Sequence, residues 1–158
     1  MNSKEAYSRA TALCSKSEKC ISDIRKKMFD WHVDQDDHDA VIDALVENKY
    51  IDEERFAMYF VRDKFRFNGW GRVKIKHHLS QKQIPSYLID QAISEIEADV
   101  YMESLKHALE VKNRSIKSED KYERRNKLMR FAAGRGFTPD EVNTLLDGVI
   151  TKSEDDEI

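Results

Sequence analysis

The chain repeats one pattern of apolar residues three times, at a period of about 50 residues. In each copy two apolar residues stand four apart, a third follows five positions later, and a second run with spacings of three and four then begins. A spacing of four and then five is typical of a helix that ends and turns into another. A period of this length predicts stacked helical units. The copies are Ile24, Met28, Val33, Val41, Ala44 and Leu45; Ile75, Leu79, Ile84, Ile89, Ala92 and Ile93; and Leu128, Ala132, Phe137, Val142, Leu145 and Leu146.

One more helix is expected ahead of each copy, over residues 4–16, 53–67 and 99–112. For the second of these helices, the spacing predicts an apolar face made of Phe56, Tyr59, Phe60 and Phe67. The chain therefore divides into three-helix repeats over residues 1–52, 53–98 and 99–150. The first copy has three extra residues, which we assign to an acidic loop at residues 34–39. Residues 151–158 form an acidic tail that we expect to be disordered.

Composition favours an all-α fold. Only two prolines and five glycines interrupt 158 residues, and good helix formers are abundant. Because a three-helix unit buries little apolar surface alone, we predict that the units stack into an elongated, curved array. Thr138, Pro139 and Glu141 have the spacing of a capping box at a helix start. No segment approaches the roughly 20 apolar residues of a membrane span or has the pattern of a signal peptide, so we expect a cytoplasmic protein without membrane contact. We also expect a monomer.

The net charge of −3 conceals a strong partition of charge along the chain. Residues 34–47 carry six acidic side chains and no Lys or Arg. By contrast, residues 62–82 have a net charge of +6, and residues 121–135 have a net charge of +5. Such asymmetry indicates a polyanionic partner, although solvated helix faces with no partner would give the same pattern.

The residue types needed for catalysis are present but form no recognisable constellation. Gly69-Trp70-Gly71 has Lys74 where a dinucleotide-binding fingerprint has its third glycine. His77-His78 are adjacent, so they point about 100° apart on a helix, which is poor geometry for one metal ion. Cys14 and Cys20 lack zinc spacing and are expected to be packing thiols. We therefore expect a protein that is not an enzyme and uses no cofactor or metal.

A binding surface is the remaining functional interpretation. Arg55, Arg62 and Arg66 lie at i, i+7 and i+11 and so share one stripe of their helix. Cationic side chains are the donors that phosphate oxygens require, and an acidic protein would attract them equally well. Trp70 could stack on a base, although we favour its packing at the corner between helices. The candidate contact residues are Arg55, Arg62, Lys64, Arg66, Arg72, Lys74, Lys76, His78, Arg124, Arg125, Arg130 and Arg135.

The stretch RFNGWGRVKIKHHL, residues 66–79, is interpreted as a corner between two helices of the middle repeat. Gly71 stands four residues before the first core isoleucine, so we expect it at the start of the second helix, whereas Asn68 and Gly69 end the first. The residues to which we assign structural roles are Gly71, Ile75, Leu79, Ile84, Phe56, Phe60 and Phe137.

Residues 50–84 resemble the central segment of the RecX family. The shared pattern is an aromatic residue followed by Asp, an acidic residue, Arg, Phe and Ala, then a basic helix, a glycine and an Ile/Leu-x-x-x-Leu helix. In this chain it reads YIDEERFAMYFVRDKFRFNGWGRVKIKHHLSQKQI. IRKKMFDWHV resembles the first repeat of the family, and KLMRFAAGRGFTPDEVNTLL resembles the third. The resemblance covers roughly residues 10–150.

This resemblance implies an all-helical regulator made of tandem three-helix repeats. RecX proteins bind the RecA recombinase, in particular its filament on single-stranded DNA, and lodge in the groove of that filament. They typically inhibit RecA, with effects on recombination, DNA repair and the SOS response, and some bind single- or double-stranded DNA directly. Two alternatives stay open: a stand-alone helical nucleic-acid-binding module, and a scaffold that binds an acidic protein.

The chain also departs from the family pattern. Cys20 and Asp23 stand where the family often has Ser and Glu at the start of the second helix, which predicts a weaker cap. The mildly acidic net charge argues against strong independent DNA binding more than against recombinase binding.

Overall fold

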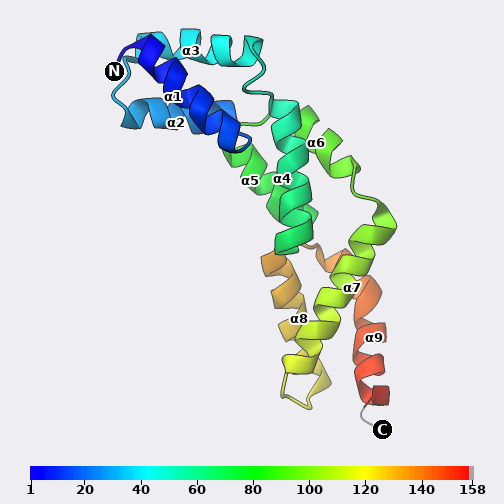
Figure 1. Ribbon diagram of the computed structural model, residues 1–158. Coiled ribbons are helices and arrows are strands. Elements are labelled where there is room, and N and C mark those ends of the chain that lie inside the picture. The colour runs from blue at the N-terminus through cyan, green and yellow to red at the C-terminus, as the bar shows by residue number, and fades with distance from the viewer. Residues whose placement is uncertain (157–158) are drawn as a thin grey trace. The chain divides into compact units, whose positions relative to one another are not determined.

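The structure, a computed structural model, describes residues 1–156, with side chains described for residues 1–151 (Figure 1). Every regular element in this range is an α-helix, which confirms the prediction of an all-α fold of tandem helices. None of these helices is long and apolar enough to span a membrane. The helices are α1 Ser3–Lys16, α2 Ile21–Asp30, α3 Gln35–Glu47, α4 Glu53–Asn68, α5 Arg72–Gln81, α6 Ser86–Ser94, α7 Ala98–Ser115, α8 Lys121–Arg135 and α9 Pro139–Asp156.

The helices follow the three expected triplets, but their packing divides the chain into two compact units. The N-terminal unit consists of residues 1–61 and 78–92. The C-terminal unit consists of residues 62–77 and the described chain from Ile93 onward. Helices α4 and α5 each pass from one unit into the other, because the boundaries fall at Val61 and at His77. The middle triplet is therefore shared between the two units.

The core of the N-terminal unit lies between α1, α2 and α3. Ala6, Ala10, Ile24, Met28 and Leu45 are all completely buried in it. The two alanines leave room for the larger side chains of α2 and α3, which is why a helix with so few large apolar residues still packs closely.

The segment assigned to an acidic loop is instead the beginning of α3. Asp34 is the N-cap of this helix, and its carboxylate accepts a hydrogen bond from the N–H of Asp36 at 3.0 Å. Acidic side chains are favourable at this end of a helix because the helix dipole is positive there. His38, one turn further, is completely buried, and its Nε2 lies 3.2 Å from the carbonyl oxygen of Val33. The extra residues of the first repeat therefore lengthen its third helix.

The core of the C-terminal unit is built on α7, which packs against both α8 and α9 (Figure 1). Tyr101, Leu105 and Leu109 form the buried stripe of α7. The Tyr101 ring lies between two other aromatic rings, with centroids 6.0 Å from Phe65 and 5.2 Å from Phe137. This aromatic group joins the end of α4, the start of α7 and the turn between α8 and α9 within one core.

The apolar face predicted for α4 is wrong in part. Phe56 is buried, but Tyr59 is 53% exposed and Phe67 is 83% exposed. The buried face continues instead through Val61, five residues after Phe56, and Phe65, four residues after Val61. Aromatic residues lie on both sides of this helix, so the sequence pattern alone left the choice of face ambiguous.

The expected disordered tail differs from the structure over most of its length. Helix α9 extends to Asp156, so residues 151–156 are helical, and only residues 157–158 lie outside the described chain. Val149 and Ile150 are buried, and the packing of this part of α9 against α7 carries the helix past the end of the repeat pattern.

Candidate binding surface

Residues 66–79 form a corner between two helices, as the repeat comparison predicted. Helix α4 ends at Asn68, and Gly69 follows with φ of +66°, a left-handed conformation that favours glycine. Gly71 directly precedes α5, which begins at Arg72. Residues 69–71 thus make the whole turn from α4 into α5.

The beginning of α5 meets the end of α8 at a contact between two glycines. The N–H of Gly71 donates to the carbonyl oxygen of Arg135 at 2.7 Å, and the N–H of Val73 donates to that of Gly136 at 3.0 Å. The backbone approach is so close that a Cβ on Gly71 would lie 2.6 Å from the carbonyl carbon of Gly136. Gly136 itself ends α8 with φ of +98°. Glycine is therefore required at both positions, by space at Gly71 and by space and conformation at Gly136.

This contact also satisfies the polar groups of two helix ends. The third free N–H at the start of α5, that of Arg72, donates to the hydroxyl of Tyr101 at 3.0 Å. The positive end of α5 faces the negative end of α8, so the two helix dipoles attract each other. The structure thereby brings together residues of the two basic segments, 62–82 and 121–135.

Side chains strengthen the same junction. The ammonium group of Lys74 donates to the carbonyl oxygen of Gly134 at 3.3 Å. The guanidinium group of Arg135 donates to the carbonyl oxygen of Asn68, the last residue of α4, at 3.2 Å. Both cations thus lie at the C-terminal end of a helix, where positive charge is favourable.

Trp70 lies between α4 and α5, and two ammonium groups lie over its ring. Its ring is half-buried, with the ammonium groups of Lys74 and Lys64 at 4.6 and 5.2 Å from the ring centroid. These contacts support the interpretation that Trp70 packs at the corner, because ammonium groups already lie over its ring. We define Lys64, Trp70, Lys74 and Arg135 as the cationic corner.

A second aromatic ring extends the same arrangement. Phe131 of α8 is half-buried, and the guanidinium group of Arg135 lies 4.9 Å from its centroid. The ammonium group of Lys112, from α7, lies 5.7 Å from the same centroid. Lys112 is not among the predicted contact residues, because the α7 segment has no concentration of basic residues. Only its folded position next to α8 relates it to the corner.

Four predicted contact residues are exposed in the C-terminal unit: Arg62, Arg66, Lys76 and Arg130. Within the described residues, no ion pair holds Arg62, Arg66 or Arg130, so these guanidinium groups keep their donors for a partner. Arg66 also borders a shallow groove whose other wall is α7, with Phe65 and Val100 among its apolar residues.

Three other predicted contact residues, Arg72, Arg124 and Arg125, have their donors used inside the fold. Arg72 lies 3.9 Å over the Tyr101 ring and forms a 3.4 Å ion pair with Glu141. Arg124 donates to the carbonyl oxygens of Asn113, Ile116 and Ser118 and to the side-chain oxygen of Asn113. Arg124 therefore closes the end of α7 and is a structural residue of the C-terminal unit.

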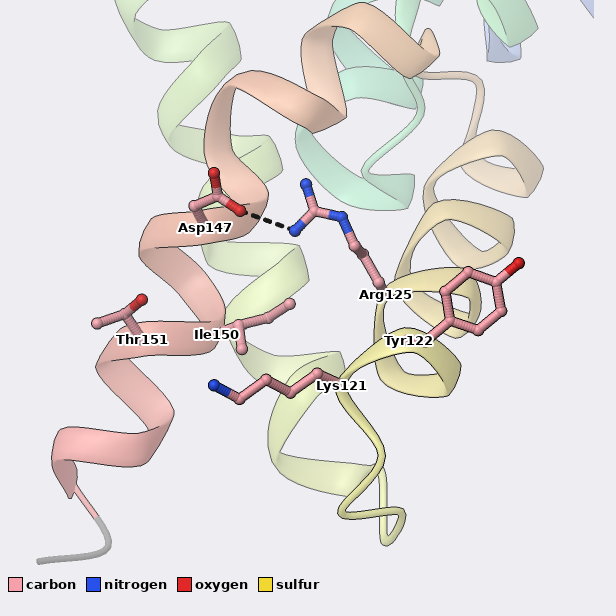
Figure 2. A pocket seen from close by; sticks show the side chains of 6 residues that line it. All are labelled: Lys121, Tyr122, Arg125, Asp147, Ile150 and Thr151. Carbon is pink, nitrogen blue, oxygen red and sulfur yellow. Dashed lines mark hydrogen bonds and ion pairs between the residues drawn. The ribbon is translucent and has the colours of Figure 1, made fainter.

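Arg125 pairs with an acidic residue across the α8–α9 interface. Its guanidinium group lies 2.7 Å from the carboxylate of Asp147. Figure 2 shows this pair above Ile150 and Lys121, with Tyr122 pointing away from it. The partial neutralisation of Arg125 makes it a weaker candidate for a partner contact than Arg130, which lies on the same helix.

The two remaining predicted contact residues, Arg55 and His78, belong to the N-terminal unit. Arg55 pairs with Glu18 at 2.6 Å and donates to the carbonyl oxygen of Lys49 at 3.1 Å. His78 is half-buried. Neither residue belongs to the cationic corner. The residues with expected structural roles are buried, except for Phe60, which is half-buried: Gly71, Ile75, Leu79, Ile84, Phe56 and Phe137.

Lys82, which directly follows α5, forms another ion pair of the N-terminal unit. Its ammonium group lies 2.8 Å from the carboxylate of Asp23, in the first turn of α2. The same carboxylate accepts the N–H of Cys20 at 3.4 Å. Burial alone would raise the pKa of Asp23, but the hydrogen bonds from Lys82 and Cys20 outweigh it and hold this pKa below its ordinary value. Asp23 therefore stays ionised and, as the N3 residue of a capping box, accepts the N–H of the N-cap residue Cys20.

Two family models match the chain. They are described as RecX, second three-helix domain, which matches residues 52–93, and RecX, third three-helix domain, which matches residues 99–146. The first match covers α4 to α6, and the second begins at the start of α7 and ends within α9.

Curated proteins of the same description match more of the chain. A regulatory protein RecX of Clostridium tetani is 31% identical over 143 residues, which are 89% of this chain and 65% of that protein. The chain thus spans just under two thirds of that relative. A regulatory protein RecX of Vibrio parahaemolyticus is 31% identical over 146 residues, which are 92% of this chain and 90% of that protein.

Two solved structures share the fold. One, described as the crystal structure of regulatory protein RecX, superposes with a TM-score of 0.84 at 25% identity and covers 92% of this chain and 73% of that chain. The other, the crystal structure of RecX from Lactobacillus salivarius, gives a TM-score of 0.83 at 18% identity, over 94% of this chain and 97% of that chain. The second likeness concerns the fold alone.

Proposed function

Because the chain belongs to the RecX family of regulatory proteins, we propose that it binds the RecA recombinase and inhibits its filament on single-stranded DNA. Through RecA it would act on recombination, DNA repair and the SOS response, in the cytoplasm. We propose no catalytic step, since the regulation would come from binding.

The observation that supports this proposal most is the convergence of the two basic segments at the Gly71–Gly136 contact. Segments about 60 residues apart in sequence contribute Lys64, Lys74 and Arg135 to one cationic corner. Arg62, Arg66 and Arg130 add exposed guanidinium groups from the helices that meet there. A surface of this kind suits a partner with phosphate or carboxylate groups, and a nucleoprotein filament offers both.

The mechanism is obstruction. With the cationic corner held against the groove of the filament, the protein would occupy the space needed for strand exchange or for the addition of the next recombinase subunit. Contacts of this kind are largely electrostatic, so the inhibition should weaken as salt concentration rises.

The test is ATP hydrolysis by the cognate RecA on single-stranded DNA, with this protein added at substoichiometric ratios. We expect a lower rate, and a rate that stays unchanged would contradict the proposal. The surface is tested by the triple variant Arg62→Glu, Arg66→Glu and Lys74→Glu, which should lose most of the inhibition at unchanged helicity.

The matched control changes the charge by the same amount at exposed lysines outside the corner. Lys4→Glu, Lys49→Glu and Lys117→Glu satisfy this requirement. Equal loss of inhibition in both triple variants would mean that net charge alone is responsible. Retained inhibition by a folded corner variant would remove these residues from the proposed surface.

A further inference from the structure

A cleft in the N-terminal unit is lined by four lysines. It has a volume of about 290 Å³ and lies between α1, α2 and the end of α5. Lys19 comes from the turn between α1 and α2, Lys26 and Lys27 come from α2, and Lys82 follows α5. Leu13 and Ile24 are its apolar residues. We call this site the lysine cleft.

The charges at the lysine cleft do not cancel. Two carboxylates, those of Asp23 and Asp30, also line it. Asp23 is already paired with Lys82 at 2.8 Å, which leaves Lys19, Lys26 and Lys27 against Asp30 alone. Among the described residues, neither Lys26 nor Lys27 forms an ion pair, and both are exposed. The cleft therefore keeps more lysines than carboxylates, and no ion pair among the described residues neutralises Lys26 or Lys27.

The walls of the lysine cleft are fixed relative to each other. The hydroxyl of Ser22 donates to the carbonyl oxygen of Lys82 at 2.8 Å, beside the Lys82–Asp23 ion pair. These two bonds join the first turn of α2 to the end of α5. Because the two walls are joined before any ligand arrives, binding has to order only the exposed lysine side chains.

The size of the cleft restricts the ligand. One turn of α-helix with its side chains is a cylinder of about 10 Å diameter and 5.4 Å length, hence roughly 400 Å³, which exceeds the cleft. Pockets for small molecules begin near 300 Å³, which is about the size of one nucleotide unit. Ammonium groups at the rim suit a phosphate, and the partly exposed side chain of Leu13 offers an apolar contact to the carbon atoms of the sugar.

We propose that the lysine cleft binds the phosphate of a nucleotide, with Lys19, Lys26 and Lys27 as its donors and Lys82 as the residue that neutralises Asp23. The site lies in the N-terminal unit, whereas the cationic corner lies in the C-terminal unit. The proposal does not depend on RecA binding. The phosphate could belong to a single strand or to a free nucleoside triphosphate, and the experiment separates these two sources.

The experiment compares the double variant Lys26→Gln and Lys27→Gln with the control Lys4→Gln and Lys49→Gln, which removes two exposed lysines of the same unit outside the cleft. No recombinase is present, so the result is independent of the proposed function. The first arm measures the fluorescence anisotropy of a labelled oligothymidylate over a series of salt concentrations. The second arm measures the binding of fluorescently labelled ATP without metal, and the third measures the binding of fluorescently labelled poly-glutamate.

Two lost phosphate contacts should reduce the slope of log affinity against log salt by about 1.4, and the affinity at 0.1 M salt by about 25-fold. We expect this loss in the strand arm, or a loss of affinity in the nucleotide arm, for the cleft variant and not for the control, and the arm that responds identifies the source of the phosphate. The proposal is overturned if neither arm separates the two variants, or if only poly-glutamate binding does. Circular dichroism of each full-length variant checks that the helices are retained.

Discussion

Replacing Gly71 by alanine would place a methyl group against the backbone of another helix. The new Cβ would lie 2.6 Å from the carbonyl carbon of Gly136 and 2.9 Å from the Cγ of Phe137. In real proteins a Cβ atom essentially never lies within 3.0 Å of such a heavy atom. Because the nearest atoms are backbone, no side-chain rotation can relieve them, and α5 and α8 must move apart.

The cost follows from the bonds at this contact. A separation of about 1 Å would lengthen the bonds from Gly71 to Arg135 and from Val73 to Gly136 beyond hydrogen-bonding distance, from their present 2.7 and 3.0 Å. Each buried polar group left without a partner costs about 1–3 kcal/mol, so we expect a loss of about 3 kcal/mol in the free energy of unfolding. This is a large share of the 5–15 kcal/mol typical of a whole domain.

The assay is equilibrium unfolding in urea, followed by circular dichroism and by fluorescence. The two tryptophans, Trp31 and Trp70, lie in different units. In a Trp31→Phe background the fluorescence therefore comes from Trp70 and reports on the corner directly. We expect the midpoint of the Trp70 transition to fall in the Gly71→Ala variant, with its slope unchanged.

The matched controls are Gly134→Ala and Gly148→Ala. Both glycines lie within helices, and a Cβ at either position meets open space. Alanine is favoured over glycine within a helix by up to about 1 kcal/mol, so these variants should be as stable as the wild type or more stable. A Gly71→Ala protein within about 0.5 kcal/mol of the wild type would refute the close contact on which the cationic corner depends.

Three further predictions concern side chains whose partners are seen in the structure. Arg124→Ala should lower the free energy of unfolding by about 2–4 kcal/mol, because four hydrogen bonds at the end of α7 are lost, whereas Arg130→Ala should change it by less than about 0.5 kcal/mol in the same urea assay. The pKa of Asp23 is lowered in the folded state, so its contribution to stability is present above its unfolded pKa near 3.8 and is lost as pH falls through the folded value. Acid unfolding should therefore be less steep in Asp23→Asn. Burial raises the pKa of Tyr101 from 10.0 to about 12, so its contribution is present below pH 10 and is lost as pH rises toward 12, and Tyr101→Phe should flatten alkaline unfolding over that interval. Thermal or urea unfolding that shows the same pH dependence in variant and wild type would contradict either assignment.

The apolar pattern was sufficient to predict the helical triplets. The structure buries every residue of the three aligned copies except Ala44 and Leu145, which are half-buried. Such a pattern is readable because burial acts on each residue with the period of its own helix. The resemblance drawn from residues 50–84 is likewise confirmed by the family matches.

The polar contacts were less predictable, because they join positions far apart in the sequence. The exposed Phe67 and the internal bonds of Arg124 were misjudged by rules that consider one helix at a time. The lysine cleft was missed for the same reason, since Lys19, Lys26 and Lys82 come from separate elements. Its only sequence signal is the Lys26-Lys27 pair, which a basic helix face would produce equally well.

The repeat position four residues before the first core residue shows why the pattern alone does not give the function. Cys20, Gly71 and Arg124 occupy it in the three copies. Cys20 begins its helix with the help of Asp23, Gly71 admits the end of α8, and Arg124 closes the end of α7. The same apolar pattern thus carries a different residue, with different contacts, at this position in each copy. Gly71 has no side chain, so the end of α8 can approach the start of α5 and the two basic segments meet there. The cationic corner therefore forms in the middle repeat, where this position is a glycine.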